Sequence, residues 1–405
     1  MPSGLLVRER FWGLFDALRE QPADGLLGLI TRFRDDPREN KIDLGVGTYR
    51  NEAGVTPVMA AVKAAEGRLL EEQRTKSYLG PEGDQRFVDL LAAVAFGAGS
   101  AHAGRLTGVQ TPGGGGALRL GAELVAAAWP GTRVWLGKPS WPNHRPIMDA
   151  ARLATAGYRH LDPATQLADF DGILAMLSGA TAGDVVLLHG CCHNPTGAGL
   201  DPAQWDVLAE LLARKGLVPF VDLAYQGLGE GLEADAYGMR RVLNSAEEAL
   251  VAYSCDKNFG LYRERTGALF VLCRNAAQAE VVRSNLLTLA RVNWSMPPDH
   301  GAAAVRIVLE SEELSVAWRT ELEAMCGRIN AVRNALAAAC PGLAALSRQR
   351  GMFSLLPIGP DRIEALRRDH GIYMAASGRV NLAGLRTSDV QTFVDALASV
   401  NAWEQ

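Results

Sequence analysis

Short apolar runs alternate with helix-compatible stretches through the middle of the chain. Residues 185–188, 218–221 and 249–253 are runs of the kind that form strands buried on both faces. A helical pattern separates the first run from the second, and a polar, helix-compatible stretch separates the second from the third. This alternation predicts a parallel sheet with crossover helices, and therefore an α/β fold.

The helix between the first two runs has start and stop signals. Asp201 can cap it, Pro202 suits its first position, and Gln204 can reach back to complete a capping box. Gly216 predicts its end. Its predicted apolar face consists of Trp205, Leu208, Leu211 and Leu212.

The pattern changes from about residue 312 onward. Long helical patterns over residues 321–339 and 361–369 flank one short strand candidate, residues 352–356. This predicts a second, smaller α+β domain, which the N-terminal segment helps to form. The expected division is an N-terminal arm with part of the small domain (1–51), a large domain (52–314) and a small C-terminal domain (315–405).

Composition narrows the classes of function. The 405 residues are 48% hydrophobic and 21% charged, as in a globular protein, and a net charge of −4 offers no basic surface for nucleic acid. No uncharged apolar run reaches the ~18 residues of a membrane span, and the apolar stretch 5–7 is too short for a signal peptide. The 6 cysteines form no paired framework, which favours free thiols. We therefore expect a cytoplasmic protein that binds neither nucleic acid nor membranes.

Polar residues follow each of the three predicted strands. They are residues 189–194, 222–225 and 254–257, and ligands of parallel sheets bind beyond the carboxyl ends of the strands. Lys257 can form an imine with an aldehyde cofactor if its amine is partly desolvated, or it can be a solvated loop lysine. Asp222 can hold a buried cation, such as a protonated pyridine nitrogen, or it can cap the next helix.

Two further segments allow alternative interpretations. The glycine run 113–116 precedes a helical stretch expected from about Ala117, so its N–H groups can surround a phosphate, or the run can be a flexible turn. Residues 189–194 (HGCCHN) contain possible metal ligands, but no second, spaced pair of ligands accompanies them. We therefore predict no metal site.

Several segments of the chain resemble the aspartate and aromatic aminotransferases of fold type I, and the aromatic (tyrosine) branch in particular. The resemblance extends from about Phe11 to Val400. It implies the pyridoxal-phosphate-dependent transferase fold, with a mostly parallel central sheet flanked by helices and a smaller α+β domain. It also implies pyridoxal 5′-phosphate as the cofactor. The segments are 43–49 (DLGVGTY), 139–144 (PSWPNH), 189–197 (HGCCHNPTG), 222–227 (DLAYQG), 257–265 (KNFGLYRER) and 376–381 (ASGRVN).

The resemblance implies three catalytic residues. Lys257 would carry the cofactor as a Schiff base and, once released, would move a proton between the substrate Cα and the cofactor. Asp222, backed by His144, would pair with the pyridinium nitrogen and keep the ring an electron sink. Tyr225 would hydrogen-bond the phenolic oxygen of the cofactor together with Asn194.

Further contacts with the cofactor are implied around its ring and its phosphate. Trp141 would stack on the face of the ring. Arg265 would bind the phosphate through its planar fork. The implied phosphate ligands are Gly114, Gly115, Ser254, Arg265 and, from a neighbouring subunit, Tyr78.

The substrate would be held by two arginines. Arg379 would bind the α-carboxylate and fix the Cα–H bond for removal, and Arg291 would meet a distal carboxylate across the interface of a homodimer with shared active sites. Gly47 would close over the substrate, which Trp141 and Asn194 would also contact. The implied small-molecule partners are amino acids and 2-oxo acids.

Three positions depart from the family pattern. Gly115 stands where a Ser or Thr is usual, so one hydroxyl contact to the phosphate is missing. Asp256 stands where a serine is usual, and its carboxylate can either raise the pKa of Lys257 or point into a salt bridge. Met296 stands where aspartate-selective relatives carry Asn, an apolar change close to the substrate side.

The choice of substrate rests on few residues. Arg291 and Arg379 suit a dicarboxylic acid, which makes 2-oxoglutarate the expected shared partner, while Met296 and Arg263 favour the aromatic branch. We therefore expect ping-pong transamination between an aromatic amino acid (tyrosine or phenylalanine, and also aspartate) and 2-oxoglutarate. The alternatives are an aspartate aminotransferase, a decarboxylase or lyase with the same cofactor, and a non-catalytic homologue.

Overall fold

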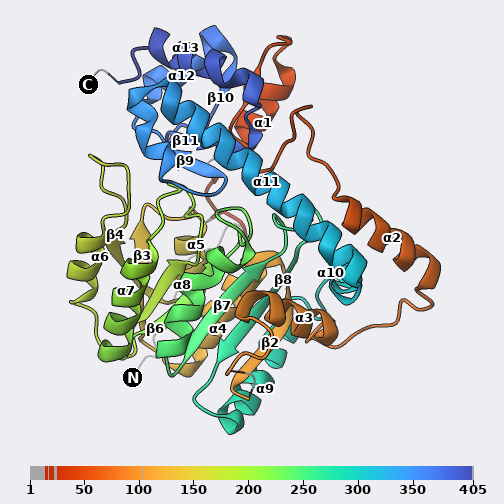
Figure 1. Cartoon of the computed structure of the whole chain (residues 1–405). Helices are drawn as coiled ribbons and strands as arrows, with labels where there is room; N and C mark the ends of the chain where they lie inside the picture. Colours follow the sequence, from red (N-terminus) through yellow and green to blue (C-terminus); the bar gives the residue numbers. More distant parts are fainter. Residues whose placement is uncertain (1–13, 17, 22–24, 103, 404–405) are drawn as a thin grey trace, which may run out of the picture.

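The computed structural model describes residues 14–16, 18–21, 25–102 and 104–403 (Figure 1). The stretch 5–7, residue Phe11 and part of the predicted N-terminal arm lie outside the described residues. Among the helices that are described, none is long and apolar enough to span a membrane.

A seven-stranded sheet forms the centre of the larger part of the molecule. Its strands run in the order β2-β8-β7-β6-β5-β3-β4, and β8 is antiparallel to both β2 and β7 while the remaining neighbours are parallel. The three predicted strands are β5, β6 and β7, so the predicted mostly parallel sheet is confirmed. The strands are β2 (Leu106–Pro112), β3 (Arg133–Lys138), β4 (Ala154–Arg159), β5 (Val185–His189), β6 (Val218–Leu223), β7 (Ala249–Ser254) and β8 (Thr266–Leu272).

Helices cover both faces of this sheet, and alternate strand residues contact one face or the other. On β5, Val186 and Leu188 belong to one buried cluster, and Val185 and Leu187 belong to a second. The first cluster packs with α3, α7 and α8, and the second with α4, α5 and α9. The helices are α2 (Ala60–Glu72), α3 (Gln85–Phe96), α4 (Gly113–Ala128), α5 (His144–Ala150), α6 (Phe170–Leu177), α7 (Pro202–Lys215), α8 (Leu232–Ser245), α9 (Ala276–Asn293) and α10 (His300–Glu310).

The start and end of α7 are as predicted. The Asp201 side chain accepts from the N–H of Gln204, and the Gln204 side chain accepts from the N–H of Asp201, which completes the capping box. Gly216 follows the helix in the left-handed conformation, with φ of 63°. These signals are local, and the structure confirms them.

The start of α4 differs from the prediction. The helix begins at Gly113 rather than near Ala117, so the glycines form its first turn instead of a loop before it. Glycine disfavours helix interiors, which is why the sequence pattern placed the start later. Tertiary contact overrides that preference, because a Cβ on Gly114 would lie only 2.9 Å from the Cβ of Ser254.

The smaller part of the molecule has its own buried cluster and two small sheets. The predicted strand 352–356 is present as β9, and the predicted helix 321–339 is longer, because Ser311 caps it at Glu312. The long helix α11 also packs against α2 and α10, so it joins the two parts (Figure 1). The elements are α11 (Glu312–Ala339), η1 (Pro341–Ser347), β9 (Phe353–Leu355), α12 (Pro360–His370), β10 (Ile372–Tyr373), β11 (Arg379–Asn381), η2 (Leu382–Gly384), η3 (Thr387–Asp389) and α13 (Val390–Ser399).

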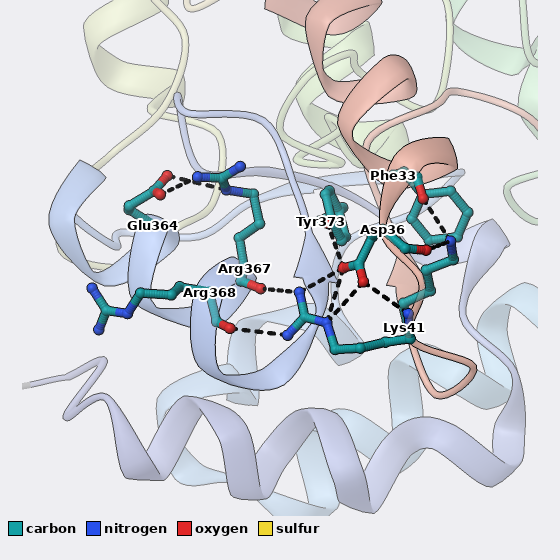
Figure 2. Close-up of polar contacts among 8 residues, drawn as sticks. Phe33, Asp36, Lys41, Glu364, Arg367, Arg368 and Tyr373 are labelled. Atoms are coloured by element: carbon teal, nitrogen blue, oxygen red, sulfur yellow. Dashed lines mark hydrogen bonds and ion pairs between the residues drawn. The ribbon is translucent and has the colours of Figure 1, made fainter.

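The N-terminal segment is bound to this smaller part. Strand β1 (Ile42–Asp43) pairs with β10 in parallel. After α1 (Gly25–Asp35), Asp36 accepts a hydrogen bond of 2.6 Å from the Tyr373 hydroxyl, and the Arg38 guanidinium donates to the carbonyls of Arg367 and Arg368 (Figure 2). The exact division into domains at 51/52 and 314/315 stays a prediction.

Candidate active site

A cavity of about 200 Å³ lies beyond the carboxyl ends of β5, β6 and β7, where the first turn of α4 also points. The parallel sheet brings the three predicted strand ends together at this edge. Its lining includes the predicted residues Gly114, Gly115, Trp141, Asn194, Asp222, Tyr225, Ser254, Lys257 and Arg265, together with Leu118, His189, Ala224 and Asp256.

Asp222 is one of two buried carboxylates of the cavity and ends a chain of polar contacts. Nε2 of His144 lies 2.9 Å from Oδ2 of Asp222, and Nδ1 of His144 lies 2.7 Å from the Ser140 hydroxyl. Burial favours the neutral carboxyl, but the hydrogen bond from His144 and the attraction to nearby positive charge outweigh it, so the pKa of Asp222 lies below its usual range. The cavity therefore offers an ionised carboxylate to a bound cation.

Lys257 projects into the same cavity. Its Nζ lies 3.8 Å from Oδ2 of Asp256 and 5.5 Å from the centre of the Tyr225 ring, and the side chain is 20% exposed. Burial lowers the pKa of the Lys257 amine, although the carboxylates of Asp256 and Asp222 oppose this effect. A lowered pKa increases the share of free amine, the form that can attack a carbonyl.

Tyr225 and Asn194 form a polar wall beside Lys257. Nδ2 of Asn194 lies 3.3 Å from the Tyr225 hydroxyl, and Oδ1 of Asn194 is buried without a partner among the described residues. Burial and the charge of Asp222 raise the pKa of the Tyr225 hydroxyl, so it is a neutral donor. Two polar groups are thus available to a bound oxygen atom.

The end of the cavity nearest α4 is suited to an anion. The first turn of α4 presents backbone N–H groups there, beside the hydroxyl of Ser254 and the guanidinium of Arg265. A side chain on Gly114 would clash with Ser254, whereas a Cβ on Gly115 would meet no atom within 4 Å. The glycine run is the first turn of a helix rather than a flexible turn, and its binding of an anion stays a prediction.

The Asp256 carboxylate makes both of the interactions that the sequence offered as alternatives, one with Lys257 and one in a salt bridge. Its Oδ2 accepts a hydrogen bond from Nη1 of Arg265 and also lies close to Nζ of Lys257. The carboxylate therefore forms the salt bridge and also acts on the Lys257 amine.

Arg379 and Gly47 do not line this cavity, and both contact Phe353 in the smaller part of the molecule. The Arg379 guanidinium lies 4.7 Å from the centre of the Phe353 ring and donates from Nη2 to the carbonyl of Gly45 at 3.0 Å. Its Nε is buried and has no partner within the described ranges, and burial lowers its pKa. A Cβ on Gly47 would lie 2.8 Å from Phe353, whose ring also contacts the Tyr225 ring.

Three further predicted residues do not line the cavity in the single chain. Tyr78 is 92% exposed, and Arg291, on α9, donates to the Ser295 hydroxyl. Sδ of Met296 accepts a hydrogen bond from the backbone N–H of Leu79, with 3.1 Å between nitrogen and sulfur, and Met296 lines a separate surface cavity. The predicted roles of Tyr78 and Arg291 need a neighbouring subunit, and the roles of all three residues stay predictions.

His189 is a cavity residue that the sequence placed among the strand-end residues but to which it gave no role with cofactor or substrate. Its ring lies 5.0 Å from that of His144, and burial together with the nearby His144 lowers the pKa of His189 to about 3, so the imidazole is neutral. Its place at the carboxyl end of β5 was the signal for a cavity residue. His144, His189 and Asp222 also lie close enough to share a metal ion, as do Cys191, Cys192 and Asp235, and the prediction of no metal stays untested.

Comparisons with known proteins agree on one family. Residues 39–397 match the family "Aminotransferase class I and II". The chain is 51% identical to the tyrosine aminotransferase of Rhizobium meliloti (strain 1021), over 96% of this chain and 100% of that protein, and 42% identical to the aspartate aminotransferase of Salmonella typhi, over 96% and 100%. A crystal structure of an aromatic-amino-acid aminotransferase from Burkholderia pseudomallei, covalently bound to pyridoxal phosphate, superposes with a TM-score of 0.93 at 38% identity, covering 96% of this chain and 99% of that one.

Proposed function

Because the chain belongs to the class I and II aminotransferases, we propose that it transfers the amino group of an aromatic amino acid to 2-oxoglutarate. The protein is an aminotransferase, and its cofactor is pyridoxal 5′-phosphate. When bound, this cofactor withdraws electrons from the substrate Cα and so makes the Cα proton removable. The observation that carries the proposal is the meeting of Lys257, Asp222 and Arg265 in one cavity at the strand ends.

The residues of the cavity fit this cofactor. The first turn of α4, Ser254 and Arg265 would hold its phosphate. At the other end, Asp222 would hold the ring nitrogen, because it is ionised and supported by His144. Asn194 and Tyr225 would bind the phenolic oxygen, and Trp141 would cover one face of the ring.

Three side chains would act on the substrate. Arg379 would hold its α-carboxylate, since a partly buried guanidinium with an unpartnered Nε needs an anion. Nζ of Lys257 would then remove the proton from Cα and return it at the cofactor, because its lowered pKa leaves it able to accept a proton. Gly47, which lies against Phe353, would help to close the cavity and exclude water.

The proposed amino-acid substrates are tyrosine and phenylalanine, with aspartate also accepted. The high identity to a tyrosine aminotransferase supports this choice, and the 42% identity to an aspartate aminotransferase makes aspartate the alternative principal substrate. An aromatic ring cannot pair with Arg291, and a buried unpaired guanidinium costs several kcal/mol. The exposed position of Arg291 on α9 supports dual use, because its head can turn toward water.

A comparison of kcat/KM for tyrosine, phenylalanine and aspartate, each with 2-oxoglutarate, tests the substrate proposal. We expect the aromatic amino acids to match or exceed aspartate. A preference for aspartate of about a hundredfold, roughly 2.7 kcal/mol, would favour the alternative. Replacing 2-oxoglutarate with pyruvate provides the control for the second substrate, since pyruvate lacks the distal carboxylate.

We further propose a cytoplasmic homodimer in which Tyr78 and Arg291 of one chain serve the site of the other. The exposure of Tyr78 and the free state of all 6 cysteines support this. Mixed dimers provide the test. A Lys257→Ala chain and an Arg291→Ala chain, each impaired with aspartate, should regain activity when co-refolded, because one intact shared site forms. No recovery in verified mixed dimers would contradict shared sites.

A further inference from the structure

A carboxylate occupies the end of the cavity that would bind the cofactor's phosphate. Asp256 is 2% exposed, and its Oδ2 accepts from Nη1 of Arg265. Its Oδ1 is fully buried and has no hydrogen-bond partner in the part of the chain that the structure describes. The Asp256 side chain therefore lies among the groups that would receive an anion, and one of its two oxygens has no partner among the described residues.

The start of α4 and the end of β7 both contact Asp256 or its ion-pair partner Arg265. From α4, a Cβ built on Gly113 would lie 3.3 Å from Oδ2 of Asp256 and 2.7 Å from Nη2 of Arg265, so the helix N-terminus and the ion pair are in contact. From the end of β7, the Ser254 hydroxyl accepts from the N–H of Asp256 at 3.3 Å. The charged and titratable groups that face the carboxylate are Arg265, Lys257, Cys255 and Tyr262.

The charges at this end of the cavity do not balance when a phosphate is added. A phosphate monoester carries about −1.5 to −2, and an ionised Asp256 would add one further negative charge. Against these stand one positive charge on Arg265 and about +0.5 from the N-terminus of α4. Lys257 lies 3.8 Å from Asp256, but burial lowers its pKa and so disfavours its positive charge. Like charges in one site disfavour ionisation, so the pair should retain a proton.

We propose that Asp256 makes cofactor binding proton-coupled, with one proton shared between its Oδ1 and an oxygen of the cofactor's phosphate. The proton comes from water, and the carboxyl O–H donates to the phosphate oxygen while Oδ2 keeps its contact with Arg265. The unpartnered Oδ1 thereby gains a partner. The inference rests on the proposed function, and it implies that this enzyme binds its cofactor more weakly as the pH rises.

The experiment uses the apoprotein and pyridoxamine 5′-phosphate, which carries the phosphate but lacks the aldehyde that reacts with Lys257. Phosphorus NMR follows the bound phosphate across the neutral range, and calorimetry gives the affinity at each pH. In the wild type the bound resonance should move with pH, with a midpoint above the value of about 6 for a free phosphate monoester. In Asp256→Asn the phosphorus resonance should keep the chemical shift of a phosphate dianion at every pH. Binding above neutral pH should be roughly tenfold tighter than in the wild type, because repulsion between close like charges is removed.

A matched control changes the same end of the cavity, nearest α4, without changing its charge. Gly115→Ser adds a hydroxyl in open space, so it should bind the probe more tightly and keep the wild-type titration. A wild-type resonance that stays at the dianion position would overturn the proposal without any variant, and so would equal titrations in the wild type and Asp256→Asn. If the probe binds to none of these proteins, the proposed function fails together with the inference.

Discussion

Replacing Lys257 by alanine is expected to lower kcat with tyrosine by about 10⁴-fold or more, because the amine that moves the Cα proton is lost. The side chain projects into the cavity, and burial gives its amine a lowered pKa. The groups proposed to hold the phosphate and the Asp222–His144 pair do not include the Lys257 side chain. This variant should therefore still bind the cofactor, although without a covalent bond. Steady-state kinetics together with cofactor content after gel filtration measure both effects.

Two controls separate chemistry from structure in this experiment. Lys257→Arg should be as inactive as the alanine variant, since a guanidinium stays protonated at neutral pH. Lys63→Ala should keep wild-type activity, because Lys63 is exposed and its ion-pair partner among the described residues is Glu66 at the surface. Full activity in Lys257→Ala would contradict the catalytic assignment.

Asp222→Asn is expected to lower kcat by roughly 10²–10⁴-fold, since breaking a buried charge pair costs about 3–5 kcal/mol. The pKa of Asp222 lies below its usual range despite burial, so the carboxylate can stabilise a positive charge on the ring nitrogen. An amide keeps the shape but not the charge. The half-reaction with tyrosine, followed by stopped-flow absorbance, reports the loss directly.

The matched control is Asp184→Asn, which lies directly before β5, at the opposite end of the strand from the cavity. Asp184 is also buried, and it accepts from the Trp135 indole and the Thr181 N–H instead of facing the cavity. This substitution should reduce thermal stability and leave the half-reaction near the wild-type rate. An Asp222→Asn rate within about twofold of wild type would show that the ring nitrogen needs no charged partner.

Local patterns in the sequence were enough to predict β5, β6, β7 and the capping of α7. Each depends on residues within one or two turns, such as Asp201 and Gln204. The start of α4 could not be predicted in this way, because the close approach of Gly114 to Ser254 decides it. The distance along the chain between those two residues hides the contact from any local pattern.

The candidate site shows the same division. Parallel strand ends converge by topology, so Asn194, Asp222 and Lys257 could be expected to meet. The Asp256–Arg265 pair depends on side-chain geometry, so the sequence left it open. His189 was among the expected strand-end residues, but the sequence gave it no role with cofactor or substrate. Tyr78 and Arg291 lie outside the cavity of the single chain, so any role of theirs at the site requires a second subunit.

The most direct test of the central claim is to find which lysine holds the cofactor. Borohydride reduction of the purified holoenzyme, followed by digestion and mass spectrometry, fixes the cofactor on its lysine as a stable adduct. We predict the adduct on the peptide that contains Lys257 and its absence from the Lys257→Ala protein. An adduct on Lys41, Lys63, Lys76, Lys138 or Lys215, or none on a protein that transaminates tyrosine, would contradict the account.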